Sequence, residues 1–82
     1  MQKELEFTLN DQMLSLLIRF NDLKKNLKLL EGQYELDKND ELLLLQIKST
    51  NEEMKELKKR FIREFRRINK EEIASYLKIK NQ

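Results

Sequence analysis

The sequence lacks several residue types on which other classes of small protein depend. It has no cysteine, so it can form neither a disulfide nor a thiolate metal site. It has no histidine, which removes the commonest metal ligand and the usual general base. There is no proline and only one glycine, Gly32, so sharp turns are few and a glycine-rich phosphate loop is excluded. These absences argue against an enzyme and favour an architecture of long helices.

Charged and apolar residues dominate what is present. Each group makes up 39% of the 82 residues, and the net charge is +2. A chain of this length forms one small domain, and its isolated core would be thin. Residues 1–46 carry 6 basic and 9 acidic side chains, whereas residues 47–82 carry 11 basic and 6 acidic ones. Antiparallel helices of opposite sign would therefore attract each other weakly.

Apolar residues in the first half repeat at alternating spacings of four and three, as in a helix that lies along another helix. This first seam consists of Leu9, Met13, Leu16, Phe20, Leu23, Leu27, Leu30 and Tyr34. The helix is expected over about residues 8–36, with either Thr8 or Asn10 as its N-cap. Gly32 offers an earlier end, but the seam continues beyond it, which favours an end near Leu36.

A polar cluster at residues 37–40 predicts a turn. Asn39 or Asp40 would then cap a second helix over about residues 41–68. The seam of this second helix is expected to contain Leu43, Ile47, Thr50, Met54, Leu57 and Phe61.

The apolar pattern changes register near Asn69. Asn69 followed by Glu72 resembles a helix cap, which predicts a kink or a short third helix over about residues 70–80. The chain, residues 1–82, is therefore predicted to be a single all-α domain. Its architecture would be an antiparallel hairpin of two long helices that packs in a hetero-oligomeric helical bundle.

Four consecutive leucines at the start of the second helix exceed what a hairpin can bury. Successive helical residues step about 100° around the axis, so the run covers most of the circumference, and a single partner helix shields one stripe. A smaller surplus occurs near the start of the first helix and in the tail. Other chains are expected to cover this surface. The predicted interface residues are Leu14, Leu17, Ile18, Leu42, Leu44, Leu45, Phe65, Ile73, Tyr76 and Leu77.

A run of basic residues crosses the second half. Four of them share one helix face: Lys59, Arg63, Arg66 and Lys70. They are candidates for contact with an anion. The favoured interpretation is a solvated face that complements the helix dipole, ahead of an acidic protein partner and of lipid or nucleic acid.

No catalytic, cofactor or metal site is predicted. Glu52, Glu53 and Glu56 recur at helical spacing, but a small hairpin offers no dry pocket that would separate their pKa values. The segment that begins at Asp37 lacks both the glycine and the bidentate glutamate of a calcium-binding loop.

Three features of the second half follow one another in a recognisable order. They are Leu42-Leu43-Leu44-Leu45-Gln46, then Asn51-Glu52-Glu53-Met54 with Phe61 after it, and last Glu72-Ile73-Ala74-Ser75-Tyr76-Leu77-Lys78. With the heptad-rich first helix and short turn, this order resembles the Mod(r) domain of a subunit of the endosomal sorting complex ESCRT-I. The resemblance covers roughly residues 20–80.

The resemblance implies a non-catalytic scaffold subunit without cofactor or small-molecule substrate. Its hairpin would pack beside hairpins of two other ESCRT-I-like subunits, in a headpiece that supports the sorting of ubiquitinated cargo into multivesicular bodies. The protein would be cytoplasmic and peripheral to the endosomal membrane, with indirect membrane contact at most.

Two alternatives stay open. One is a homodimeric four-helix bundle with a regulatory role. The other, less favoured, is a nucleic-acid or membrane-surface binder that uses the basic face.

Overall fold

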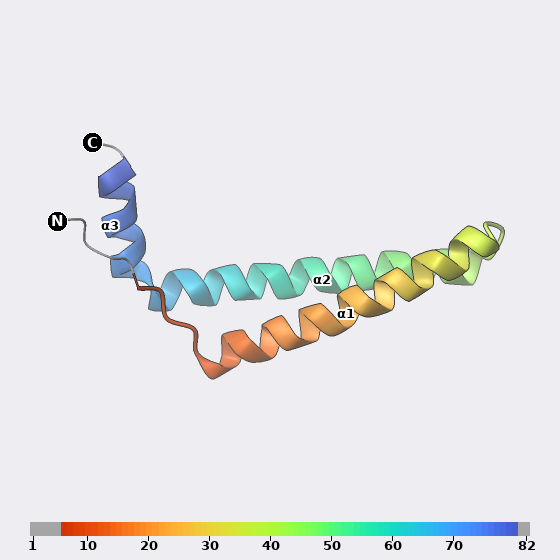
Figure 1. Cartoon of the computed structure of the whole chain (residues 1–82), viewed down its shortest axis with the longest axis horizontal. Helices are drawn as coiled ribbons and strands as arrows, with labels where there is room; N and C mark the ends of the chain where they lie inside the picture. Colours follow the sequence, from red (N-terminus) through yellow and green to blue (C-terminus); the bar gives the residue numbers. More distant parts are fainter. Residues whose placement is uncertain (1–5, 81–82) are drawn as a thin grey trace.

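The computed structural model describes residues 6–80, and this range contains three helices and no strand. Helix α1 spans Asp11–Leu36, α2 spans Glu41–Ile68 and α3 spans Lys70–Lys80. Helices α1 and α2 lie side by side in antiparallel orientation, while α3 turns away from the end of α2 (Figure 1). The predicted all-α hairpin is confirmed.

Asn10 is the N-cap of α1. Its extended backbone places the side-chain oxygen 2.9 Å from the backbone nitrogen of Met13, which donates the hydrogen bond. This contact satisfies one of the free N–H groups of the first turn. Of the two caps that the sequence allowed, Thr8 therefore lies outside the helix.

The turn between α1 and α2 is short because aspartate side chains organise its backbone. Asp37 accepts a hydrogen bond from the backbone N–H of Asn39 at 3.2 Å. Asp40 caps α2 by accepting from the N–H of Leu43 at 3.1 Å. Helix α1 runs past Gly32 to Leu36, so the glycine is an interior helical residue and not a cap.

The two predicted seams form the contact between the helices. Every seam residue within α1 or α2 is at least half-buried, whereas Leu9, which precedes α1, is exposed. Only Met13 and Leu57, at 0% and 5% exposed, are fully buried apolar residues in the described range. The Thr50 hydroxyl donates to the carbonyl of Gln46 at 2.8 Å, so the one polar seam residue satisfies itself within its own helix.

Asn69 separates α2 from α3. It is the C-cap of α2, and its backbone N–H donates to the carbonyl of Phe65 at 3.0 Å. The predicted break at this residue is confirmed, but the predicted side-chain cap on the third helix is wrong. The Asn69 amide oxygen instead accepts from the N–H of Thr8, at 2.6 Å.

The molecule is elongated. Its radius of gyration is 18.1 Å and its extents are 58 × 28 × 17 Å, whereas a compact chain of this length has a radius of gyration of about 12 Å. Two long helices with a single contact seam have no third layer to cover their outer surfaces. Large side surfaces of the hairpin consequently stay open.

Candidate protein-interaction surface

The hairpin has two side surfaces, one on each side of the α1–α2 contact, and one of them is polar. The polar groove, as we name it, is lined by Gln12, Ser15, Leu16, Arg19, Glu53, Glu56, Leu57 and Arg60. Arg19 of α1 and Glu53 of α2 form an ion pair across it. The charged groups on this side therefore pair with each other within the chain, and water also solvates them well.

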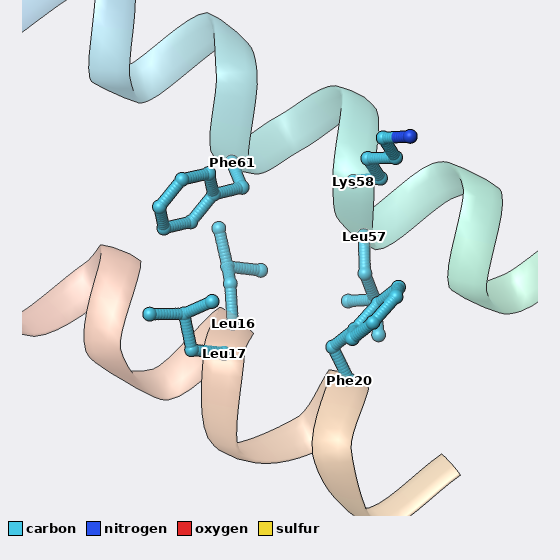
Figure 2. Close-up of a pocket in the computed structure, with 6 residues that line it drawn as sticks. All are labelled: Leu16, Leu17, Phe20, Leu57, Lys58 and Phe61. Carbon is cyan, nitrogen blue, oxygen red and sulfur yellow. The ribbon is translucent and has the colours of Figure 1, made fainter. Parts of the chain in front are cut away.

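The other side surface is apolar. The apolar groove is lined by Leu16, Leu17, Phe20, Leu57, Lys58 and Phe61; it is open to solvent and has a volume of about 240 Å³. Figure 2 shows the five apolar side chains gathered between the two helices, with the Lys58 ammonium directed away from them. The groove thus presents hydrocarbon with a cation at its edge.

The apolar surface continues along the hairpin in both directions. Toward the turn, Phe20 and Met54 line a second hollow together with Asn51, Lys55 and Lys58. Toward the open end, the rings of Phe61 and Phe65 stack with centroids 6.2 Å apart.

The N-terminal segment meets the apolar surface at its open end. The ring of Phe7 lies with its centroid 5.2 Å from that of Phe65, and aromatic pairs at such separations are stabilising. Figure 1 shows this segment running from the start of α1 to the junction of α2 and α3. Phe7 is therefore a part of the surface that the helical pattern of the sequence did not reveal.

Asn69 fixes the segment at that junction. Besides accepting from Thr8, its side-chain amide donates to the carbonyl oxygens of Thr8 and Phe65, each at 3.0 Å. Asn69 is 2% exposed, and a buried amide with both its oxygen and its nitrogen bonded is a stable arrangement. The sequence indicated the break at Asn69, but a contact over 61 residues leaves no local signal.

A second polar contact closes the open end. Glu64 accepts a hydrogen bond from the side-chain amide of Asn10 at 2.9 Å and also pairs with Arg67. The bond from Arg67, followed by the bond from Asn10, lowers the pKa of Glu64 below its usual 4.5. The same pairing raises the pKa of Arg67. Glu64 thus ties the start of α1 to the end of α2 through its ionised form.

The predicted interface residues are distributed over several surfaces. Leu17 lines the apolar groove, and Phe65 contacts two other rings. Ile73 is half-buried on α3. The remaining predicted positions are all exposed: Leu14, Ile18, Leu42, Leu44, Leu45, Tyr76 and Leu77. The structure brings only some of these residues together, and a role for each in an interface stays a prediction.

The four consecutive leucines, Leu42 to Leu45, point in different directions around α2. Leu43 belongs to the contact with α1 and is half-buried. Leu42 and Leu45 are 65% and 62% exposed, and Leu44 is 37% exposed. By helical spacing, Leu44 lies on the side of Lys55 and the apolar groove, while the other two lie elsewhere. The surplus is present, but it is not one patch.

The predicted anion-contact residues do not lie on one uninterrupted helix. Lys59, Arg63 and Arg66 are exposed on α2, whereas Lys70 is the first residue of α3, beyond the break at Asn69. Lys59 pairs with Glu56 at 3.7 Å. Contact of these residues with an anion stays a prediction.

The described residues hold no group of three His, Cys, Asp or Glu side chains that could bind a metal ion. Of the three glutamates that recur at helical spacing in α2, Glu53 and Glu56 each pair with a basic side chain. Within residues 6–80, no helix is long and apolar enough to cross a membrane.

Comparison with known proteins adds no relative. No family model, no curated protein and no solved structure matches this chain. The resemblance to the Mod(r) domain therefore stays a prediction from the sequence.

Proposed function

We propose that this chain is a non-catalytic assembly subunit whose hairpin becomes part of a helical bundle with helices of other chains. The observation that carries this proposal is the imbalance between apolar content and burial. Among residues 6–80, the fully buried apolar side chains are Met13 and Leu57, and thirteen large apolar side chains are exposed. Burial of apolar surface is the main stabilising term in folding, so a partner that covers this surface would complete the core.

The exposed area supports the same proposal. The chain exposes 7323 Å², whereas a compact monomer of this mass exposes about 5,200 Å². The excess is about 2,000 Å², which is more than one partner of a standard protein complex contributes and is in the range of obligate assemblies. A surface of this size and composition is typical of a subunit that folds fully in its complex.

We propose the headpiece of an ESCRT-I-like complex as the setting of this assembly. The resemblance of residues 20–80 to the Mod(r) domain supports it, and a hairpin that lacks a third layer is compatible with it. The two partners would be the hairpins of two further ESCRT-I-like subunits. The complex would act at the endosomal membrane in sorting ubiquitinated cargo into multivesicular bodies.

A pair of matched substitutions tests the assembly. Leu17→Glu places a charge in the apolar groove, and Ser15→Glu places the same charge in the polar groove two residues away on the same helix. We expect Leu17→Glu to weaken assembly by about 2 kcal/mol or more, roughly 30-fold, because a charge would be buried without a partner. Ser15→Glu should leave assembly nearly unchanged.

The experiment measures the size and the composition of the complex in cells that make the chain naturally. A tagged copy expressed at its natural level would be cross-linked with an amine-reactive reagent and analysed by mass spectrometry. Links from Lys58 in the apolar groove and from Lys55 in the adjoining hollow to other helical chains are expected, and Leu17→Glu should remove them. An unlinked chain that sediments as a monomer and unfolds cooperatively with ordinary stability would contradict the proposal.

The same experiment separates the two kinds of assembly. Links that join only copies of this chain would favour the homodimeric four-helix bundle. Links to the two other ESCRT-I-like subunits would favour the headpiece. Either outcome is distinguished from the monomer by sedimentation.

A further inference from the structure

The charges along the apolar surface indicate what kind of helix covers it. We propose that the occupant of the apolar groove is an amphipathic helix of another protein chain, with acidic side chains on both flanks of its apolar stripe. This inference rests on the proposed assembly function and adds the chemistry of the partner. It follows from the placement of lysines and carboxylates on the two sides of the hairpin.

Cationic side chains border the apolar surface along both helices. On α2, Lys55 and Lys58 line the groove and its extension toward the turn. On α1, Lys24 and Lys28 follow Leu17 by seven and eleven residues, which places all three on one side of the helix. The apolar surface therefore has a lysine pair on each bank.

Within residues 17–28 of α1 and 50–61 of α2, the carboxylates lie elsewhere. Glu31 is the first carboxylate on the α1 bank beyond this stretch, toward the turn. Asp22 lines a hollow with Ser15 and Arg19, and Glu53 and Glu56 line the polar groove. Glu52 is two residues from both Thr50 and Met54 of the seam, so it points away from α1.

The basic residues that have carboxylate partners also lie away from the groove. The salt bridges in the described part of the chain join Arg19 to Glu53, Lys38 to Glu35, Lys59 to Glu56 and Arg67 to Glu64. None of these pairs includes a lysine that borders the apolar surface. The rim is thus available to carboxylates from outside.

A second copy of the chain is a poorer occupant than an acidic helix. Two copies that pair through the same surface around a two-fold axis present the same side chains to each other. The lysines of one copy would face the lysines of the other, and like charges in contact oppose pairing. An acidic flank on a different chain turns the same rim into a source of attraction and specificity.

The dimensions of the surface fit a helix. From Leu17 to Lys28 the rise along α1 is about 16 Å, or three helical turns. A third helix laid between α1 and α2 would insert apolar side chains at heptad positions a and d between Leu17, Phe20 and Phe61. Its e and g positions would then meet the lysines on the two banks.

Two synthetic peptides test the charge requirement. Both contain three heptads with leucine at a and d; one has glutamate at every e and g position, and the other has lysine there. Like charges at these positions oppose self-pairing of either peptide. Binding of each labelled peptide to the full chain would be measured by fluorescence anisotropy at low and high salt.

We expect the acidic peptide to bind about tenfold more tightly than the basic one, with the preference shrinking at high salt. Changing both Lys55 and Lys58 to glutamate should reverse the preference. The matched control changes Lys59 and Arg63 to glutamate. It makes the same change in net charge on α2 but away from the groove, and it should preserve the preference for the acidic peptide. This control also shows whether the added charge alone disturbs the fold.

Four results would overturn the inference. The peptides could bind equally, or the reversal could occur in the control variant instead. The chain alone could form a dimer that Leu17→Glu dissociates, which would assign the groove to a second copy. Binding of phosphatidylserine vesicles that Leu17→Glu abolishes would assign it to a lipid surface.

Failure of this inference is distinguishable from failure of the assembly function. If neither peptide charge is preferred but Leu17→Glu still disrupts the cross-linked complex in cells, the assembly stands and the acidic partner does not. If Leu17→Glu has no effect in cells, the assembly function itself is contradicted.

Discussion

The two grooves of the hairpin share a floor and differ in their walls. Leu16 and Leu57 line both of them. On one side the walls are Leu17, Phe20 and Phe61, and on the other side they are amide, hydroxyl and charged groups. The residues on one side of the seam therefore form a polar surface that water solvates well, and the residues on its other side form an apolar surface that a protein partner could cover.

The polar groove is already satisfied by contacts within the chain. Arg19 and Glu53 pair across it, and both remain partly solvated. No comparable contact within the described residues crosses the apolar groove, whose walls Leu17, Phe20 and Phe61 are only half-buried in the isolated chain. One side of the hairpin therefore has its charged groups paired within the chain, while the other side has apolar side chains that no described element covers.

The largest expected effect comes from removing the shared floor. Leu57→Ala should lower the free energy of unfolding by about 2–5 kcal/mol, because it leaves a void that both helices border. Urea denaturation followed by helical circular dichroism measures it. Leu45→Ala, at a position that is 62% exposed, is the control and should change stability by less than about 0.5 kcal/mol. Equal effects of the two would mean that the seam is not the core.

The next largest effect is expected from loss of the Asn69 amide at the open end of the apolar surface. Asn69→Ala removes the amide that bonds Thr8 and Phe65, and should cost about 1–3 kcal/mol because the part-buried N–H and C=O of Thr8 lose their partner. Amide hydrogen exchange at Thr8 would be faster in the variant. Asn26→Ala, at an exposed position on α1, should leave that exchange rate unchanged. Unaltered protection of Thr8 in Asn69→Ala would show that the segment is held by Phe7 alone.

The ion pair across the polar groove is expected to contribute less. A double-mutant cycle with Arg19→Ala and Glu53→Ala should give a coupling of about 0.2–1 kcal/mol, because both side chains are solvated. Molar salt should reduce the coupling further. A coupling of several kcal/mol that salt does not change would mean that the polar side is as water-excluding as a core.

The smallest expected effect is a dependence of stability on pH through Glu64. Because its pKa is lower in the folded chain than the usual 4.5, the ionised form stabilises the fold at neutral pH. This contribution is lost as pH falls through the folded pKa. The stability difference between the natural chain and Glu64→Gln should therefore be present at neutral pH and should disappear as the carboxylate becomes protonated in the folded chain. A difference that grows on acidification would contradict the assignment.

The course of the helices was predictable because its causes are local. The heptad spacing from Met13 to Tyr34 places one stripe toward α2 whatever the rest of the chain does. The aspartates of the turn act on backbone groups within three residues. The end of α1 at Leu36 and the break at Asn69 followed from such signals.

The candidate surface was predictable only in part. Leu17 and Phe65 were expected at an interface, and they do belong to the apolar surface. Lys55 and Lys58 were not singled out, because their significance depends on which side of α2 faces the groove. Phe7 meets Phe65, and Thr8 meets Asn69, across most of the chain, and no local pattern encodes such contacts.

The sequence by itself determined that this protein is a pair of long antiparallel helices with more apolar surface than the pair can bury. Helical periodicity and capping are short-range, so composition and spacing suffice for them. Only the tertiary structure decided that the surplus divides, with one continuous groove bordered by lysines and other leucines scattered around α2. The reason is that the direction of a side chain relative to a groove depends on how two helices are rotated against each other, which is a property of their packing.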